Sequence, residues 1–268
     1  MSRLISVVGL FVGLAATSAL AADYPDMMRG SYPASWDMSD EGDPLGFEFG
    51  VRYFYSAGFN EMTIAGAYHN IQDTKHAVEV HGRIDDFSTG TFLKGYAGYS
   101  GVGGGSHNTP LTGGTVAIDS GTLAYALVDF GYLGFGTEAF TFGPFVGYQF
   151  VNAGSSTAAP AESVNAEYHM VRLGVAARAE LGDQLDLSAE LAINPYADLS
   201  GGLSTGAVIQ STLVGVSGEA MVGYHATDNI TVRAGGRAWY LTDSFGAGGG
   251  SSYSSLRVGG LFEVTYDF

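Results

Sequence analysis

Three side chains close together in the chain could support acid–base chemistry. His69, Asp73 and His76 combine imidazoles with a carboxylate, the groups that most often transfer protons in hydrolases. Such groups act only with a partner within hydrogen-bond reach, and the neighbouring sequence identifies none. We expect these residues in a loop, where they would carry chemistry only if the fold brought another acid to them.

Other clusters of polar residues have simpler interpretations. His225 with Asp228, and Asp85 with Asp86, stand beside short turns, and His169 is expected to face outward at an interface. The glycine runs 103–105 and 248–250 are expected in loops, because no helix follows either of them to bind a phosphate.

The segment 37–48 has the outline of a calcium-binding loop, with Asp37, Ser39, Glu41 and Gly42 ahead of Glu48 at the twelfth position. No helical pattern flanks it, Pro44 interrupts it, and Glu48 begins an alternating segment. We interpret it as a solvated acidic linker. The sequence therefore predicts no catalytic residue, no cofactor and no metal site.

The elements that would position these side chains are strands. In 171–181, Val, Leu and Ala at the odd positions alternate with Arg172, Gly174, Ala176, Arg178 and Glu180, and a period of two is typical of a β-strand with one apolar and one polar face. The pattern recurs about ten times, although the sequence leaves eight strands as an alternative. The expected strands are 46–55, 78–85, 91–99, 123–133, 140–150, 171–181, 185–194, 209–224, 230–241 and 256–268.

The expected connections alternate in length. Those at 57–75, 100–121, 152–165, 195–208 and 242–253 are long, whereas those at 86–90, 134–137, 182–184 and 227–229 are tight turns. Transmembrane barrels have this asymmetry, with short periplasmic turns and long extracellular loops. The predicted fold class is all-β, an antiparallel up-and-down transmembrane β-barrel.

The N-terminal region predicts export. Residues 1–21 read as a signal peptide, with Arg3, an apolar stretch and small residues at a cleavage site. Residues 22–44 form an acidic periplasmic lead-in, and 45–268 form the barrel. There is no cysteine, and no later apolar run approaches the length of a membrane helix. A membrane protein without such helices must be a closed barrel, because every backbone group in lipid needs a partner.

Charge decides which face of each strand points inward. A net charge of -16 argues against nucleic acid as a partner. Eight of the eleven Lys and Arg residues fall on the polar face of strands; an arginine turned to lipid at the midplane costs about 2–4 kcal/mol, so this face should line the lumen. The predicted lumen residues are Glu48, Arg52, Glu79, Arg83, Lys94, Asp129, Arg172, Arg178, Glu180, Glu190, Glu219, Arg233, Arg237, Arg257 and Glu263.

The C-terminal strand carries a resemblance. Phe262-Glu-Val-Thr-Tyr-Asp-Phe268 resembles the terminal signal that the barrel assembly machinery of bacteria reads. Together with Arg29-Gly-Ser-Tyr32, Trp36, the run from Gly42 to Tyr53, Arg83-Ile-Asp-Asp86 and Gly143-Pro-Phe-Val-Gly-Tyr148, it resembles the porin-family β-barrels of alphaproteobacteria, especially uncharacterised rhizobial-type members. The resemblance implies an outer-membrane location, with outer-membrane lipid and the assembly machinery as partners, but no particular activity.

Ten strands also resemble the omptin proteases, whose carboxylates and histidine lie at the extracellular rim. His69, Asp73 and His76 are expected on that side, but the family's facing Asp pair and Asp–His pair are missing here. We therefore expect no enzyme.

Three functions remain open at this point. The first is a structural or surface-exposed barrel with a narrow charged lumen, because eight strands are just filled by side chains and ten lie near that limit. The second is a porin-like diffusion channel for small solutes. The third is a membrane-embedded hydrolase.

Overall fold

The computed structural model describes residues 45–64, 66–101, 103–109, 113–137, 139–157, 163–243 and 252–268, and these form β-strands joined by turns. The predicted signal peptide and acidic lead-in lie outside the described residues. Among the described residues, no helix has the length and apolar character needed to cross a membrane. The strands are β1 (Leu45–Ile64), β2 (Ala67–Asp86), β3 (Thr91–Ser100), β4 (Gly103–Thr109), β5 (Gly114–Tyr132), β6 (Phe135–Thr137), β7 (Phe140–Thr157), β8 (Val164–Glu180), β9 (Leu185–Leu203), β10 (Val208–His225), β11 (Ile230–Asp243) and β12 (Ser252–Asp267).

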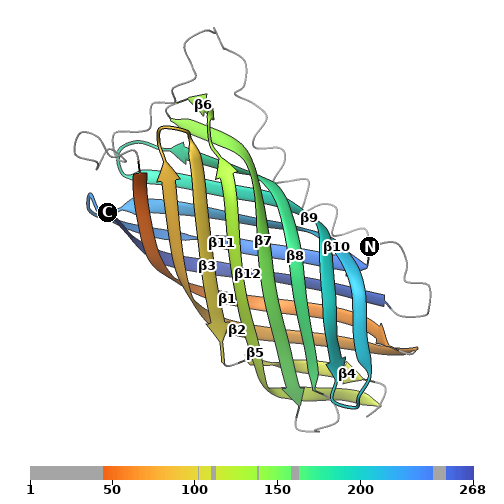
Figure 1. The fold of residues 1–268 in the computed structure, drawn as a ribbon. Helices are drawn as coiled ribbons and strands as arrows, with labels where there is room; N and C mark the ends of the chain where they lie inside the picture. The colour runs from red at the N-terminus through yellow and green to blue at the C-terminus, as the bar shows by residue number, and fades with distance from the viewer. Residues whose placement is uncertain are drawn as a thin grey trace.

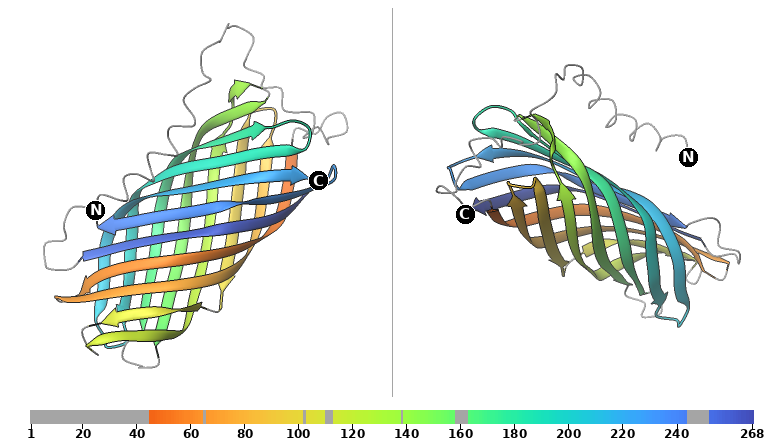
Figure 2. Two further views of the ribbon diagram at one scale, coloured as in Figure 1. Left: turned by 180° about the vertical axis from the view of Figure 1, so that it is seen from behind. Right: turned by 45° about the horizontal axis from the view of Figure 1, so that its top comes forward.

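These strands close into an antiparallel barrel of ten strands, which confirms the predicted fold class. β3 and β4 follow one another along a single barrel strand between β2 and β5, and the short β6 extends the edge of β7. β12 pairs with β1 and closes the ring, so the two ends of the barrel sequence lie side by side (Figures 1 and 2). Closure leaves no open sheet edge for the backbone to satisfy in lipid.

One part of the outer surface is a continuous apolar band. On β1 the outward side chains from Phe47 to Tyr55 are all exposed and apolar, and β7, β8 and β12 repeat this pattern. Such a run spans about nine residues, the length that a tilted strand needs to cross the hydrocarbon core of a bilayer. Aromatic side chains border the band at both ends, as in the interfacial girdles of membrane barrels. The chain therefore spans a membrane with roughly half the length of its strands.

Beyond the band, at the end of the barrel opposite Leu45 and Phe268, the polarity of the two faces reverses. On β2, Asn70, Gln72 and Thr74 face outward while Ile71 is buried inside. The other strands contribute inward side chains to the same apolar core, which includes Met62, Val164, Ala166, Leu199, Leu203, Ile209 and Leu213. A barrel wall that stands in water must be polar outside and apolar inside, so this end projects beyond the lipid.

The long loops predicted from the sequence are largely strand. β1 continues to Ile64 and β2 begins at Ala67, so the expected loop 57–75 is a hairpin whose pairing runs almost to its tip. In the same way, parts of the other four expected loops belong to β4, β5, β7, β8, β9, β10, β11 and β12. The prediction placed the strand ends too early because it required an apolar lipid-facing stripe, which a strand in water does not have.

Two β-bulges mark the change of environment. The register of β9 shifts by one residue against both neighbours at Pro195, which follows the inward Asn194 and precedes the outward Tyr196 and inward Ala197. Proline cannot donate to a sheet and is accommodated at a bulge. A second shift in β5 lies at Asp119. On one side of each bulge the even-numbered residues face inward, and on the other side the odd-numbered residues do. A sequence pattern continued across the bulge therefore assigns the remaining side chains of that strand to the wrong face of the wall.

At the opposite end of the barrel the connections 86–90, 182–184 and 227–229 are tight turns, as the sequence predicts, whereas the expected turn 134–137 contains the short strand β6, which pairs with β7. Asp86 closes the β2–β3 turn by accepting hydrogen bonds from the backbone N–H groups of Ser88 and Thr89 and from the Ser88 hydroxyl. These bonds stabilise the carboxylate and hold the pKa of Asp86 below its ordinary value. Gly90 has a φ of 72°, a conformation that glycine adopts without strain.

The reversal of polarity along β2 can be tested with a matched pair of arginines. Val80 faces lipid near the middle of the apolar band, whereas Gln72 faces outward above it. Val80→Arg is expected to lower the free energy of unfolding in lipid vesicles by about 2–4 kcal/mol, the cost of a lipid-facing arginine at the midplane. Gln72→Arg should change it little. Equal effects of the two variants in urea titrations would contradict this placement of the membrane.

Candidate functional site

The lumen collects every Lys and Arg side chain of the described residues. Two of the eleven Lys and Arg residues precede residue 45, and the other nine all point into the barrel. Of the predicted lumen residues, eleven are buried, whereas Arg178, Glu180, Glu190 and Glu219 are partly exposed within the lumen. The outer surface of the described residues consequently carries no Lys or Arg.

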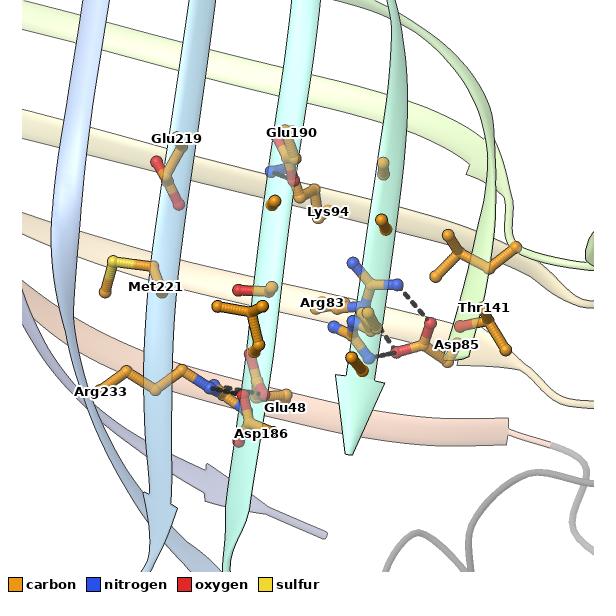
Figure 3. Close-up of a pocket in the computed structure, with 18 of the residues that line it drawn as sticks. Glu48, Arg83, Asp85, Lys94, Thr141, Asp186, Glu190, Glu219, Met221 and Arg233 are labelled. Atoms are coloured by element: carbon orange, nitrogen blue, oxygen red, sulfur yellow. Dashed lines mark hydrogen bonds and ion pairs between the residues drawn. The ribbon is translucent and has the colours of Figure 1, made fainter. Parts of the chain in front are cut away.

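The lowest charged layer, nearest the turns, is centred on Arg233. Its Nη1 lies 2.9 Å from Glu48 Oε2 and 3.1 Å from Glu263 Oε1, and its Nε lies 3.4 Å from Asp186 Oδ1. Arg52 donates to the other oxygen of Glu263. These residues come from β1, β9, β11 and β12, which lie within five consecutive strands, so the ion pairs of Arg233 with Glu48 and Asp186 link strands that are not hydrogen-bonded to each other on one side of the barrel. Figure 3 shows Arg233 beside Glu48 and Asp186.

A second group of charges crosses the barrel between β3, β5, β8 and β9. Lys94 forms a hydrogen bond with Glu190, and Arg172 Nε donates to Asp129 Oδ1 at 3.2 Å. The amide oxygen of Gln149 accepts from Arg172 Nη1. Gly147 faces Asp129 directly, and a Cβ there would lie 1.7 Å from the carboxylate, so glycine makes room for the charge.

Arg237 closes the middle of the lumen together with a layer of aromatic rings. Its Nη1 donates to Glu79 Oε1 and its Nε to Glu219 Oε2, both at 2.7 Å. Its guanidinium lies 4.1 Å from the ring centroid of Tyr96, a cation–π geometry. The rings around this contact come from four strands and pack against one another: Phe54, Tyr96, Tyr125 and Trp239.

A cavity opens between this layer and the turns. Its wall includes Arg83, which donates two hydrogen bonds to Asp85, and Arg178, whose Nη1 lies 3.7 Å from Asp85 (Figure 3). Asp85 lies beside the β2–β3 turn, as expected, and is buried at the mouth of the lumen.

A further charged group lies above the aromatic layer, in the part of the barrel that stands in water; the sequence predicted Arg257 in the lumen but not its partners Asp73 and Lys75. Arg257 Nη2 donates to Asp73 Oδ1 at 2.7 Å, and Lys75 Nζ lies 3.8 Å from the same carboxylate. Asp73 and Lys75 were expected in a loop, but both are buried inside the barrel. Their spacing of two along β2, continuing that of Glu79 and His81, was the signal that could have placed them.

The three candidates for acid–base chemistry do not come together. His69 and Asp73 point inward, and His69 Nδ1 lies 3.2 Å from Nε2 of His107. His76 points outward at the level of the lipid, where its Nδ1 forms a hydrogen bond with the hydroxyl of Tyr53. His169 makes a similar outward contact with Tyr148, in keeping with its predicted interfacial position.

The comparisons with known proteins identify the fold. No protein-family model and no curated protein sequence matches the chain. Among solved structures, the outer membrane protease OmpT from Escherichia coli aligns with a TM-score of 0.61 and 11% identity, covering 88% of this chain and 100% of that chain. The translocator domain of the autotransporter NalP from Neisseria meningitidis aligns with a TM-score of 0.40 and 10% identity, covering 87% of this chain and 91% of that chain. At 11% identity the likeness to OmpT concerns the fold, which with the lipid-facing band places the chain in the outer membrane.

The layer around Arg237 can be tested by removing one charge and then its partner. Arg237→Ala leaves the buried Glu79 and the partly exposed Glu219 without this guanidinium, which should cost about 3–5 kcal/mol of unfolding free energy. Adding Glu79→Gln should recover part of that loss. Denaturant unfolding of the single variants and the double variant measures this coupling, and simple additivity would contradict the contact.

Proposed function

We propose that this protein is a non-conducting, non-enzymatic outer-membrane barrel with a structural or surface-exposed role. The observation that carries the proposal is the plugged lumen: Arg237, held between Glu79 and Glu219, lies within the ring of Phe54, Tyr96, Tyr125 and Trp239. A solute would have to break these contacts to pass.

The barrel above the plug supports the same proposal. Its interior is filled largely by an apolar core together with the buried ion pairs of Asp73 with Arg257 and Lys75, and it contains a hydrogen bond between Tyr168 and Tyr253. A pore for polar solutes needs polar walls along its length. The channel hypothesis would therefore require both the charged layers and this core to rearrange.

The partners of His69 and Asp73 support a non-enzymatic role. Asp73 is engaged by Arg257 and Lys75, and His69 contacts the imidazole of His107. His76 faces the opposite side of the barrel wall. The hydrolase hypothesis needs an acid and a base facing a substrate, and these three residues do not supply that geometry.

The water-exposed end of the barrel offers a surface for such a role. It is rigid, because its strands remain paired far above the lipid. Its outward side chains include Glu61, Glu167 and Asp198 but no Lys or Arg among the described residues.

We also propose that the chain belongs with the porin-family barrels of alphaproteobacteria, because of the segments Arg83-Ile-Asp-Asp86 and Gly143-Pro-Phe-Val-Gly-Tyr148.

Planar-bilayer recording tests the plugged lumen. The folded protein, verified by its shifted gel mobility when unheated, is expected to produce no steady conductance steps in symmetrical salt. A porin of known conductance, added to the same bilayer, shows that channels would be detected. Reproducible unitary steps from the purified protein would overturn the proposal in favour of the channel.

The proposed partners are outer-membrane lipid and the barrel assembly machinery, which would recognise the C-terminal strand. The Phe268 side chain is exposed, and its backbone N–H donates to the carbonyl of Phe47 at 2.9 Å, beside the closing β1–β12 pair. Phe268→Ala should reduce the amount assembled in the outer membrane several-fold, while Phe135→Ala, an exposed phenylalanine at the same end, should not. Fractionation of cells expressing each variant gives the comparison. Equal yields would remove Phe268 from the signal.

A further inference from the structure

Three ligand-type side chains converge in the lower lumen from neighbouring strands. Glu48 on β1, His81 on β2 and Glu263 on β12 each offer one donor atom, and these atoms lie within 4.8 Å of one another. All three side chains are buried. The closing pair of strands and its neighbour therefore build this cluster on a rigid part of the wall.

One nitrogen atom of the His81 imidazole is left without a hydrogen-bond partner in this cluster. Its Nδ1 is buried and has no hydrogen-bond partner. It lies 3.4 Å from Glu48 Oε1 and 3.7 Å from Glu263 Oε2. At these distances the three atoms could coordinate one ion. The remaining oxygens, Glu48 Oε2 and Glu263 Oε1, both contact Arg233, which fixes the orientation of the two carboxylates.

The surrounding charges favour a cation. The cavity that contains the cluster is lined by seven carboxylates and five Lys or Arg side chains, a surplus of two negative charges when His81 is neutral. A burial of unbalanced charge in a confined site is costly. One divalent cation would balance the surplus.

The cavity also gives a route to the cluster. Its wall runs from Glu48, His81 and Glu263 to Ala139, Thr141 and Glu180 at the turn end of the barrel. An ion could thus enter from the turn end of the barrel, without crossing the layer around Arg237.

We propose that Glu48, His81 and Glu263 form a binding site for a divalent transition-metal ion. One imidazole nitrogen and two carboxylate oxygens suit Zn²⁺ or Mn²⁺ better than an alkaline-earth ion, which prefers oxygen ligands alone. Arg52 would release Glu263 Oε2 and keep its contact with Glu219, whose Oε1 already lies 3.5 Å from Arg52 Nη1. Neither the sequence nor the comparisons identify this site.

Zn²⁺ binding to the untagged, folded chain in detergent tests the proposal. Wild-type protein and His169→Gln, a matched histidine replacement on the outer surface, are expected to bind one more equivalent than His81→Gln by calorimetry and by metal analysis after dialysis. The acidic segment 22–44 is common to all three proteins, so the difference isolates the lumen site. No Zn²⁺ bound by the wild type, or equal stoichiometry in all three, would overturn the proposal and leave a proton on His81 as the balancing charge.

A second variant keeps the test decisive if His81→Gln does not fold. Glu48→Asp retains the charge that Arg233 needs but withdraws the ligand oxygen by one methylene. It should weaken Zn²⁺ binding at least tenfold relative to the wild type. Glu180→Asp, at the mouth of the same cavity and outside the cluster, should not weaken it, and equal weakening by the two variants would contradict the assigned ligands.

Discussion

The structure depends on the exclusion of charge from lipid. Every Lys and Arg of the described residues points into the barrel, where carboxylates accompany them, and the lipid-facing band has only apolar and aromatic side chains. A shift of one residue in any strand register would exchange these faces. Because such a shift would put arginines such as Arg172 or Arg237 in hydrocarbon, the charges specify the register as firmly as the apolar stripe does. The inward charges thus specify the register of the strands, and the ion pairs that fill the lumen are a consequence of that register.

Along its length the barrel wall passes from lipid into water. At membrane level the barrel is apolar outside and charged inside, whereas at the far end it has a polar wall and an apolar core. The transition coincides with the bulges at Pro195 and Asp119. Between the two regions, the layer of Arg237 and its aromatic neighbours belongs to both, since its rings pack against the core and its guanidinium pairs with buried carboxylates. This layer separates the cavity at the turn end from the projecting part of the barrel, and it is the reason for proposing a role in structure or at the cell surface over transport.

The sequence predicted the strands that cross the lipid, their inward faces and three of the four tight turns, because alternation and turn chemistry are local signals. It failed where the signal depends on the environment. Asn70, Gln72 and Thr74 look like loop residues unless water is known to surround that end, and Pro195 looks like a strand end unless a bulge accommodates it. His81 stood on the predicted polar face, yet its convergence with Glu48 and Glu263 required the register between β1, β2 and β12. Partners across a barrel are set by closure, which no single segment encodes.

The measurement that bears most directly on this account is a nitroxide scan of β2, which is simple because the chain has no cysteine of its own. Single cysteines at positions 70–84, spin-labelled in lipid vesicles, report exposure to oxygen, which concentrates in lipid, and to a water-soluble nickel complex. The account predicts an unbroken period of two, with the outward positions 78, 80 and 84 exposed to oxygen and 70, 72 and 74 exposed to nickel. Loss of the alternation between positions 70 and 76, or nickel access at position 80, would contradict it.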